Sequence, residues 1–300
     1  MSGPVLDIEE FLRIRRGLRS LKDLNKFEYP KSTLSSILNQ RIVEYVKRKY
    51  TYYLERLNEL AEYWNKNRRI PRWLRLPPIL RIRFLLKSLG YTSGLIRNAL
   101  RNPDILDDQD LVDLVLDAIL KDYVYSPVAI RFQTVKGYIG ERIIMDWLES
   151  MSVEFSVEGM LRGTCKKTPD FYLMKPIWED VKWMESKAMF GDIRIHSAYW
   201  RKQYYDYFKE FGRGIVVYWF GHIKGLVFAS NGSFISEDFR NRIKMVAYVK
   251  KRELKAEKRK LIRILYEIAE KYKKGKRIVV GNNRDLINML RGLGFEIRNI

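Results

Sequence analysis

Apolar residues in the first 125 positions recur at intervals of three and four, which is the spacing of a helix that buries one face. Leu34, Ile37, Leu38 and Ile42 show the pattern. No run of alternating polar and apolar residues, which would indicate a strand, interrupts this part of the chain. We therefore predict an all-helical region over residues 1–125.

Two short segments of this region resemble a helix-turn-helix. The first predicted helix covers residues 79–88, and a glycine-containing turn at residues 89–92 leads to the second, over residues 93–101. Arg97 and Arg101 on the second helix are candidate nucleic-acid contacts. An ordinary helical hairpin with solvated arginines fits the same pattern, so both interpretations stay open.

From about residue 132 the pattern changes. A helix that ends near Ser150 is followed by short runs rich in β-branched and aromatic residues, and a helical segment over residues 198–211 precedes the last of these runs. The order helix, three strands, helix, strand predicts an α/β domain, which we place at residues 126–230. The predicted strands cover residues 153–157, 170–174, 181–187 and 214–220.

The third predicted region, residues 231–300, is strongly basic. Between Lys250 and Arg277 there are 13 Lys or Arg and 4 Glu, and the apolar spacing predicts a basic helix with one packed side. A strand, a helix and a last strand follow. The charge is typical of a solvated helix face, although the open side could also follow a line of phosphates.

The charge of the whole chain changes the picture more than its size does. The 300 residues contain 57 Lys and Arg but 36 Asp and Glu, a formal net charge of +21. An excess of this size predicts a polyanionic partner, and the interleaved aromatic residues favour nucleic acid over a membrane surface.

One cysteine, Cys165, excludes a disulfide framework and a cysteine-rich zinc site within one chain. The N-terminus does not read as a secretory signal, and no apolar run is long enough to span a bilayer. The expectation is a cytoplasmic protein without a membrane span.

Candidate chemistry is concentrated in two groups of residues. Thr168-Pro169-Asp170 is followed by Glu185-Ser186-Lys187, and both groups lie at predicted strands. Since side chains alternate along a strand, Glu185 and Lys187 point to the same face. If the strand led by Asp170 pairs beside them, two carboxylates and a lysine share one site.

This combination is suited to phosphodiester hydrolysis. Two carboxylates make a hard oxygen site for Mg²⁺ or Mn²⁺, which can activate a bound water. A lysine beside the metal can orient that water and stabilise the negative transition state. Taken alone, Pro-Asp commonly starts a turn and Glu-x-Lys is often a surface charge pair, so the prediction rests on their combination.

At these residues the chain resembles the PD-(D/E)xK nuclease superfamily, and more closely its TPD-motif family. That family includes archaeal proteins and the eukaryotic codanin-interacting nuclease, and it is similar to archaeal Holliday-junction resolvases. The resemblance implies a restriction-endonuclease-like αβββαβ core. It is carried by TPDFYL at 168–173, WMESKAMFGD at 183–192 and HSAYWRKQYYDYFKEFGRGIVVYWFG at 196–221.

The resemblance also implies roles for individual residues. Asp170 and Glu185 would be metal ligands, joined by the backbone carbonyl of Ser186, and Lys187 would be the catalytic lysine. Glu141 lies in a helix that resembles the first core helix of the superfamily, where it would support a second metal or hold a metal-bound water. A plain surface glutamate is the alternative.

Other candidates are weaker. Gln203 and Tyr207 lie one helical turn apart and can reach one site, as in RecB-type members, but a packed aromatic helix fits equally. His196 follows the Glu-x-Lys strand after a short loop, which suits either a position near the scissile phosphate or a structural role. Asp192 has the same status, and we expect Cys165 to be inert.

The sequence therefore predicts a deoxyribonuclease that uses Mg²⁺ or Mn²⁺, with an endonuclease acting on branched or structured DNA as the expected form. The alternatives are a nucleic-acid-binding adaptor with a nuclease-like fold and an RNA-directed nuclease. A homodimer is expected if junctions are cut, because resolution needs two active centres.

Overall fold

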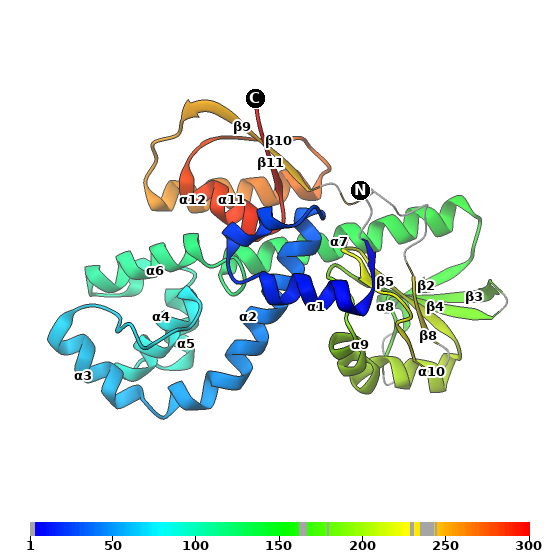
Figure 1. Ribbon diagram of the computed structural model, residues 1–300, viewed down its shortest axis with the longest axis horizontal. Coiled ribbons are helices and arrows are strands. Elements are labelled where there is room, and N and C mark those ends of the chain that lie inside the picture. Colours follow the sequence, from blue (N-terminus) through cyan, green and yellow to red (C-terminus); the bar gives the residue numbers. More distant parts are fainter. Residues whose placement is uncertain (1–3, 162–166, 179, 229–230, 235–242, 244) are drawn as a thin grey trace. The chain divides into compact units, whose positions relative to one another are not determined.

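Six strands from the middle of the chain form one mixed sheet in the computed structural model (Figure 1), in the order β2-β3-β4-β5-β8-β7. Strands β2, β3 and β4 are antiparallel neighbours, whereas β5 runs parallel to β4 and β8 runs parallel to β5. The strands are β2 (Phe155–Val157), β3 (Phe171–Ile177), β4 (Val181–Lys187), β5 (Gly214–Tyr218), β7 (Val227–Phe228) and β8 (Asn231–Phe234).

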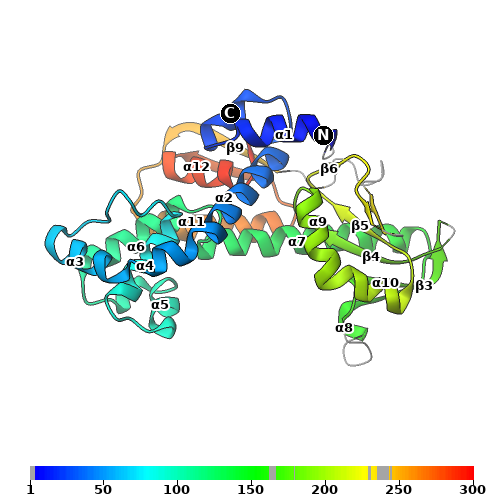
Figure 2. The same ribbon diagram turned by 60° about the horizontal axis from the view of Figure 1, so that its bottom comes forward.

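Helices cover both faces of this sheet (Figure 2). Helix α7 (Pro127–Ser150) precedes β2 and lies on one face from Val135 onward. The opposite face carries α9 (Ile193–Tyr199), the π-helical turn η3 (Trp200–Tyr204) and α10 (Tyr205–Phe211). The predicted order of helix, three strands, helix and strand is found, with a short added helix α8 (Glu158–Leu161), and the α/β class is confirmed.

Aromatic side chains fill the space between the sheet and helices α9 and α10. Gly214 permits this packing, since a Cβ there would lie 1.9 Å from the ring of Trp183. A side chain at that position of β5 would displace the indole from beneath the helices. The buried cluster consists of Trp183, Tyr204, Tyr207, Val216, Tyr218 and Leu226.

The structure describes residues 4–161, 167–178, 180–228, 231–234, 243 and 245–300. They fall into two units, each built from separate stretches of chain: residues 1–37 with 135–245, and residues 38–134 with 246–300. The three consecutive regions expected from the sequence stay a prediction.

Within the first unit, residues 5–36 are joined to the segments around the sheet by specific hydrogen bonds. Strand β1 (Val5–Leu6) pairs in parallel with β6 (His222–Ile223). Beyond it, Thr33 Oγ1 donates to the carbonyl of Phe220 at 2.8 Å, and Ser36 Oγ accepts from the backbone N–H of Phe190 at 2.8 Å.

The described residues up to 125 are helical except for strand β1 and the connecting turns, largely as predicted. Helices α4 (Pro78–Ser88) and α5 (Ser93–Ala99) form the expected pair, and the Thr92 side chain caps α5 by accepting from Leu95 N. Arg97 and Arg101 are exposed, but α5 ends at Ala99, so Arg101 lies in the turn after the helix and not on it as predicted. The remaining elements are α1 (Ile8–Gly17), η1 (Leu21–Lys26), α2 (Lys31–Leu54), α3 (Leu57–Asn67), η2 (Pro103–Ile105) and α6 (Gln109–Lys121).

The C-terminal residues form a second sheet of three parallel strands, in the order β10-β9-β11. The predicted basic helix is wrong at its beginning, because Lys250–Glu253 complete a strand and the helix begins at Lys258. Basic residues are compatible with an exposed strand end as well as with a helix face. The elements are β9 (Val246–Glu253), α11 (Lys258–Lys273), β10 (Ile278–Asn282), α12 (Arg284–Gly292) and β11 (Glu296–Asn299).

None of the helices in the described part of the chain combines the length and the apolar character that crossing a membrane requires.

Candidate active site

Pairing between β3 and β4 brings the two sequence groups together. Phe171 lies opposite Met184 and Tyr172 opposite Trp183, so that the next pair along the strands is Asp170 and Glu185. Two hydrogen bonds hold this end of the hairpin. Asp170 N donates to Glu185 Oε2 at 3.1 Å, and Ser186 N donates to Asp170 Oδ2 at 2.7 Å.

Lys187 completes the cluster. Its Nζ donates to Glu185 Oε1 at 2.5 Å, as expected for residues two apart on one strand face. The ammonium also lies over the ring of Tyr199 from α9, 4.9 Å from its centroid. Only 15% of the Lys187 side chain and 3% of the Glu185 side chain are exposed, so this ion pair is shielded from water.

Shielding changes the acidity of all three groups. Burial raises the pKa of Glu185, and the charge of Asp170 raises it further against the opposing effect of Lys187. Burial likewise raises the pKa of Asp170, although Lys187 and the Ser186 N–H oppose the rise. Burial alone would lower the pKa of Lys187, but Glu185 and Asp170 outweigh it, so the pKa is raised and the lysine stays cationic.

Glu141 approaches the cluster from α7, and the glycine before it explains how. A Cβ on Gly140 would lie 2.3 Å from Trp219 Nε1 and 2.7 Å from Ser186 Oγ, so only a glycine lets α7 come this close to β4. Glu141 keeps contact with solvent, yet partial burial raises its pKa to about 7, with further contributions from the charges of Asp170 and Glu158. The helix glutamate therefore lies within electrostatic reach of Asp170.

Gly140→Ala should lower the free energy of unfolding by about 2 kcal/mol, because the added methyl group overlaps the Trp219 indole and the Ser186 hydroxyl. Gly137→Ala is the matched control on the same helix. Its nearest neighbour would be Glu141 Oε1 at 3.9 Å, so this variant should gain about 1 kcal/mol from helix propensity. Denaturant unfolding measures both, and equal effects would contradict the packing argument.

Ser186 points to the opposite face of β4, as strand alternation predicts. Its Oγ accepts from Trp219 Nε1 at 2.8 Å, and Trp219 N donates to the Lys187 carbonyl at 3.0 Å. The role of the Ser186 backbone carbonyl as a ligand stays a prediction.

Glu158 is a nearby acidic residue that the sequence analysis missed. It follows β2 directly, and its N–H donates to the Asp170 carbonyl at 3.2 Å. Its charge raises the pKa of both Asp170 and Glu141. The pairing of Val157 with Phe171 is the signal that could have found it, because that register sets Glu158 beside Asp170.

Tyr207 and Gln203 lie on either side of the change from π-helix to α-helix. Tyr207 is buried in the aromatic cluster, with its ring 5.3 Å from that of Trp183, which agrees with the packed-helix alternative. Burial raises the pKa of its hydroxyl, and the charges of Glu185 and Asp170 contribute. Gln203 has a buried Oε1 for which the described residues provide no hydrogen-bond partner. A role of either residue in placing substrate stays a prediction.

His196 and Asp192 occupy structural positions. Asp192 is the N-cap of α9, where its Oδ1 accepts from Ile195 N at 2.8 Å. His196 is fully buried, and its Nδ1 lies 2.9 Å from the hydroxyl of Tyr218. These contacts favour the structural interpretation of both residues, and Cys165 lies outside the described residues.

His196 should make stability depend on pH. Burial lowers its pKa from 6.5 to about 4, so the folded protein keeps it neutral where the unfolded chain binds a proton. This contribution is complete above pH 6.5 and is lost as the pH falls toward 4, by about 3 kcal/mol in total. Unfolding measured at pH 7 and pH 4.5 should show a smaller difference for His196→Gln than for the wild type. An unchanged difference would rule out this origin.

The donor set fits a divalent cation that keeps most of its waters. Among the described residues there is no group of three or more His, Cys, Asp or Glu side chains arranged to hold a metal. Mg²⁺, however, is usually held by one or two carboxylates with water and substrate oxygens. Asp170 and Glu185 provide two such carboxylates, and their pKa values are raised first by burial, which disfavours the ionised form that a bound cation would stabilise.

The stretch of chain that carries these residues matches one protein family. Residues 107–239 match the family described as "Protein of unknown function TPD sequence-motif", a range that includes Asp170, Glu185 and Lys187. No solved structure matches the chain.

Relatives named CDAN1-interacting nuclease 1 extend the similarity over most of the chain. Those from Mus musculus and Homo sapiens are 31% identical to it over 242 residues, covering 71% of this chain and 83% of the relative. The one from Xenopus laevis is 29% identical over 250 residues, covering 73% and 81%. The chain therefore belongs to the TPD sequence-motif family, together with these CDAN1-interacting nucleases.

Proposed function

We propose that this protein is a metal-dependent nuclease that hydrolyses DNA, with a PD-(D/E)xK active site on a restriction-endonuclease-like core. The main support is the buried cluster at one end of β3 and β4. There Asp170 and Glu185 lie side by side, and Lys187 donates a hydrogen bond to Glu185. Burying an ion pair beside a second carboxylate costs stability, which favours a catalytic role for this cluster over a purely structural one.

Asp170 and Glu185, with the Ser186 carbonyl, would hold Mg²⁺ or Mn²⁺, which lowers the pKa of a bound water when present. Lys187 has its own part. Its raised pKa keeps it charged, and the bond to Glu185 together with the ring of Tyr199 keeps the ammonium in place. A fixed cation beside the scissile phosphate stabilises the negative charge that develops during hydrolysis.

Glu141 is suited to a proton-related role at the same site. With a pKa of about 7 it can accept or donate a proton near neutral pH, and α7 holds it within reach of Asp170. Its proposed task is to hold a water beside the carboxylates or to support a second cation.

DNA is proposed as the substrate because three features support it together. The net charge of +21 favours a polyanion, and the relatives carry the name nuclease. Exposed Arg97 lies on the second helix of the helix-turn-helix-like pair, and exposed Arg101 lies in the turn that follows it. Branched forms such as junctions and flaps are the expected geometry, and a homodimer is expected if junctions are cut.

A cleavage panel tests the proposal. Labelled junctions, flaps, splayed arms, linear duplexes and a matched RNA duplex are incubated with Mg²⁺, Mn²⁺ or EDTA. The expected result is cleavage of DNA that requires the metal. Binding without cleavage under every condition would favour the adaptor alternative, and cleavage confined to RNA would favour an RNA-directed enzyme.

A further inference from the structure

The second sheet has one face covered by helices and one face that is open. Helices α11 and α12 lie on the same side of it (Figures 1 and 2). Ala247, Val249, Ile278 and Val280 are buried toward that side. Val279, which alternation directs to the other side, is 38% exposed. This open face carries side chains that packing within the sheet does not require.

An arginine and a tyrosine form a flat platform on the open face. Tyr248 on the central strand β9 lies level with Val279 of β10 and Arg298 of β11. Arg277, just before β10, lays its guanidinium over the Tyr248 ring, 4.0 Å from the centroid. A stacked guanidinium and phenol present an extended planar surface of the kind on which nucleobases stack.

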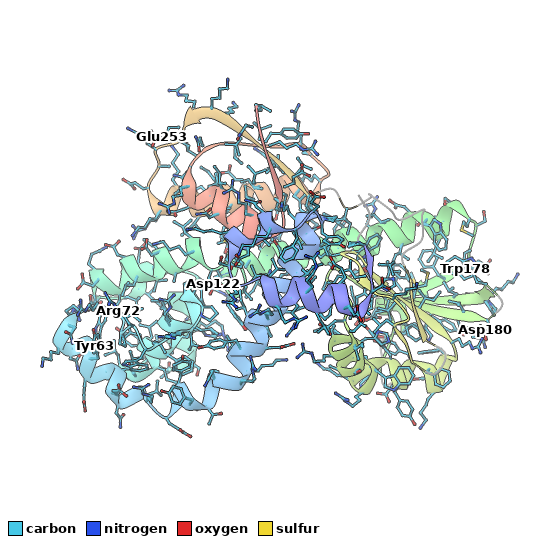
Figure 3. All side chains as sticks on the ribbon, in the orientation of Figure 1. Tyr63, Arg72, Asp122, Trp178, Asp180 and Glu253 are labelled. Atoms are coloured by element: carbon cyan, nitrogen blue, oxygen red, sulfur yellow. The ribbon has the colours of Figure 1, made fainter. Side chains whose placement is uncertain are left out.

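An open pocket of about 610 Å³ lies at the carboxyl ends of β9 and β10. Three basic side chains line it, Lys250, Arg252 and Lys255, and all three are exposed. Glu253, labelled in Figure 3, is the acidic residue among the lining side chains and lies 3.9 Å from Lys255. The pocket is therefore positively charged on balance.

The wall of this pocket depends on a glycine in β10. A Cβ on Gly281 would lie 2.6 Å from the Cβ of Leu254, so the segment that follows β9 packs directly against β10. That close approach brings Leu254 and its neighbour Lys255 to the pocket. The position of Lys255 at the pocket therefore follows from the packing of Leu254 against β10.

The open face of this sheet combines a basic pocket with the platform formed by Arg277 and Tyr248. This combination suits a ligand that has both phosphates and accessible bases. A duplex keeps its bases paired and stacked inside, whereas a single strand can offer a base to a protein surface. We propose that the open face of the β10-β9-β11 sheet binds single-stranded DNA. Lys250, Arg252 and Lys255 contact its phosphates, and a base stacks on Arg277. The choice of DNA rests on the proposed function; the binding itself does not require cleavage.

The test measures binding of a fluorescein-labelled oligothymidylate to the full chain by anisotropy, in EDTA and at several salt concentrations. Lys250→Glu combined with Arg252→Glu should weaken binding by roughly tenfold or more, and the salt slope should fall by about 0.7 for each lost phosphate contact. Arg277→Ala should weaken binding by roughly tenfold through lost stacking. A duplex of the same length should lose less affinity with Arg277→Ala.

Lys260→Glu combined with Lys271→Glu is the matched control, because it changes the charge equally on α11, which covers the opposite face. It should weaken binding much less, with thermal unfolding unchanged in both double variants. Equal losses for the two double variants, or tighter binding of a matched RNA strand, would overturn the proposal. Photocrosslinking to an iododeoxyuridine oligonucleotide should map to residues 248–255, and crosslinks confined to other segments would also overturn it. Because EDTA prevents cleavage, failure here leaves the nuclease proposal standing.

Discussion

Asp170→Asn should lower the rate of metal-dependent DNA cleavage by at least about a hundredfold. Asparagine has nearly the same shape and can still accept the hydrogen bond from Ser186 N, so the strand pairing should survive. What is lost is one of the two negative charges that would hold the cation. Single-turnover cleavage of the best substrate in the panel, followed with saturating enzyme, separates this loss from a change in DNA affinity.

The stability of this variant provides a second readout. Asp170 contributes to the raised pKa of Glu185, so removing its charge relieves a buried repulsion. The free energy of unfolding of Asp170→Asn should therefore equal or exceed that of the wild type, although the variant loses activity. Lys187→Met should also be inactive, but it should be less stable, because Glu185 and Asp170 then lose their buried cation.

A carboxylate at the far end of the same hairpin is the control. Asp180, labelled in Figure 3 beside the turn between β3 and β4, pairs with Arg213 at the surface. Asp180→Asn should cleave DNA as the wild type does. Full activity of Asp170→Asn, or equal losses from the two substitutions, would show that the cluster is not the active centre.

Asp122→Ala should lower the free energy of unfolding of the unit formed by residues 38–134 and 246–300 by about 4 kcal/mol, because three backbone N–H groups lose a buried acceptor. Asp122 lies between α6 and α7 (Figure 3), and its two oxygens accept from Ile79 N, Val124 N and Tyr125 N at 2.8 to 2.9 Å. Ile79 belongs to the first turn of α4, so the carboxylate ties the first helix of the helix-turn-helix-like pair to a distant segment. Denaturant unfolding measures the loss.

Two further variants test this explanation. Asp122→Asn keeps one carbonyl oxygen and should lose about half as much stability, because it retains part of the acceptor set. Asp113→Ala removes an exposed carboxylate from α6 and should change the free energy of unfolding by less than about 0.5 kcal/mol. A similar loss for Asp113→Ala and Asp122→Ala would assign the effect to charge instead of to the backbone bonds.

Local patterns were sufficient for much of the sheet. The run at β4 was predicted with the bounds that the structure has, Val181–Lys187, from its β-branched and aromatic content. Alternation of side chains along a strand, which is a property of the backbone, placed Glu185 and Lys187 on one face, and their side chains are in contact. The helical first part was also predictable, since apolar spacing alone specifies a helix with one buried face.

The sequence predicted local structure less well where the conformation of a segment depends on pairing with segments far away along the chain. The end of β9 was assigned to a helix because its basic residues suit either structure, and its strand conformation depends on pairing with β10 and β11, which come later in the chain. Glu158 was missed for a similar reason, as its place beside Asp170 follows from strand register. The π-helical turn before Tyr205 has no signal in the residue spacing that we used.

The sequence by itself determined which chemical groups are available and which of them share a strand face, because these depend on residue type and backbone period. Asp170, Glu185 and Lys187 were identified in that way, with the resemblance adding Glu141. Only the tertiary structure decided how deeply these groups are buried, that His196 packs against Tyr218, and that Gly140 lets α7 approach β4. Burial and acidity depend on everything that surrounds a group in space, and most of those neighbours lie far away along the chain.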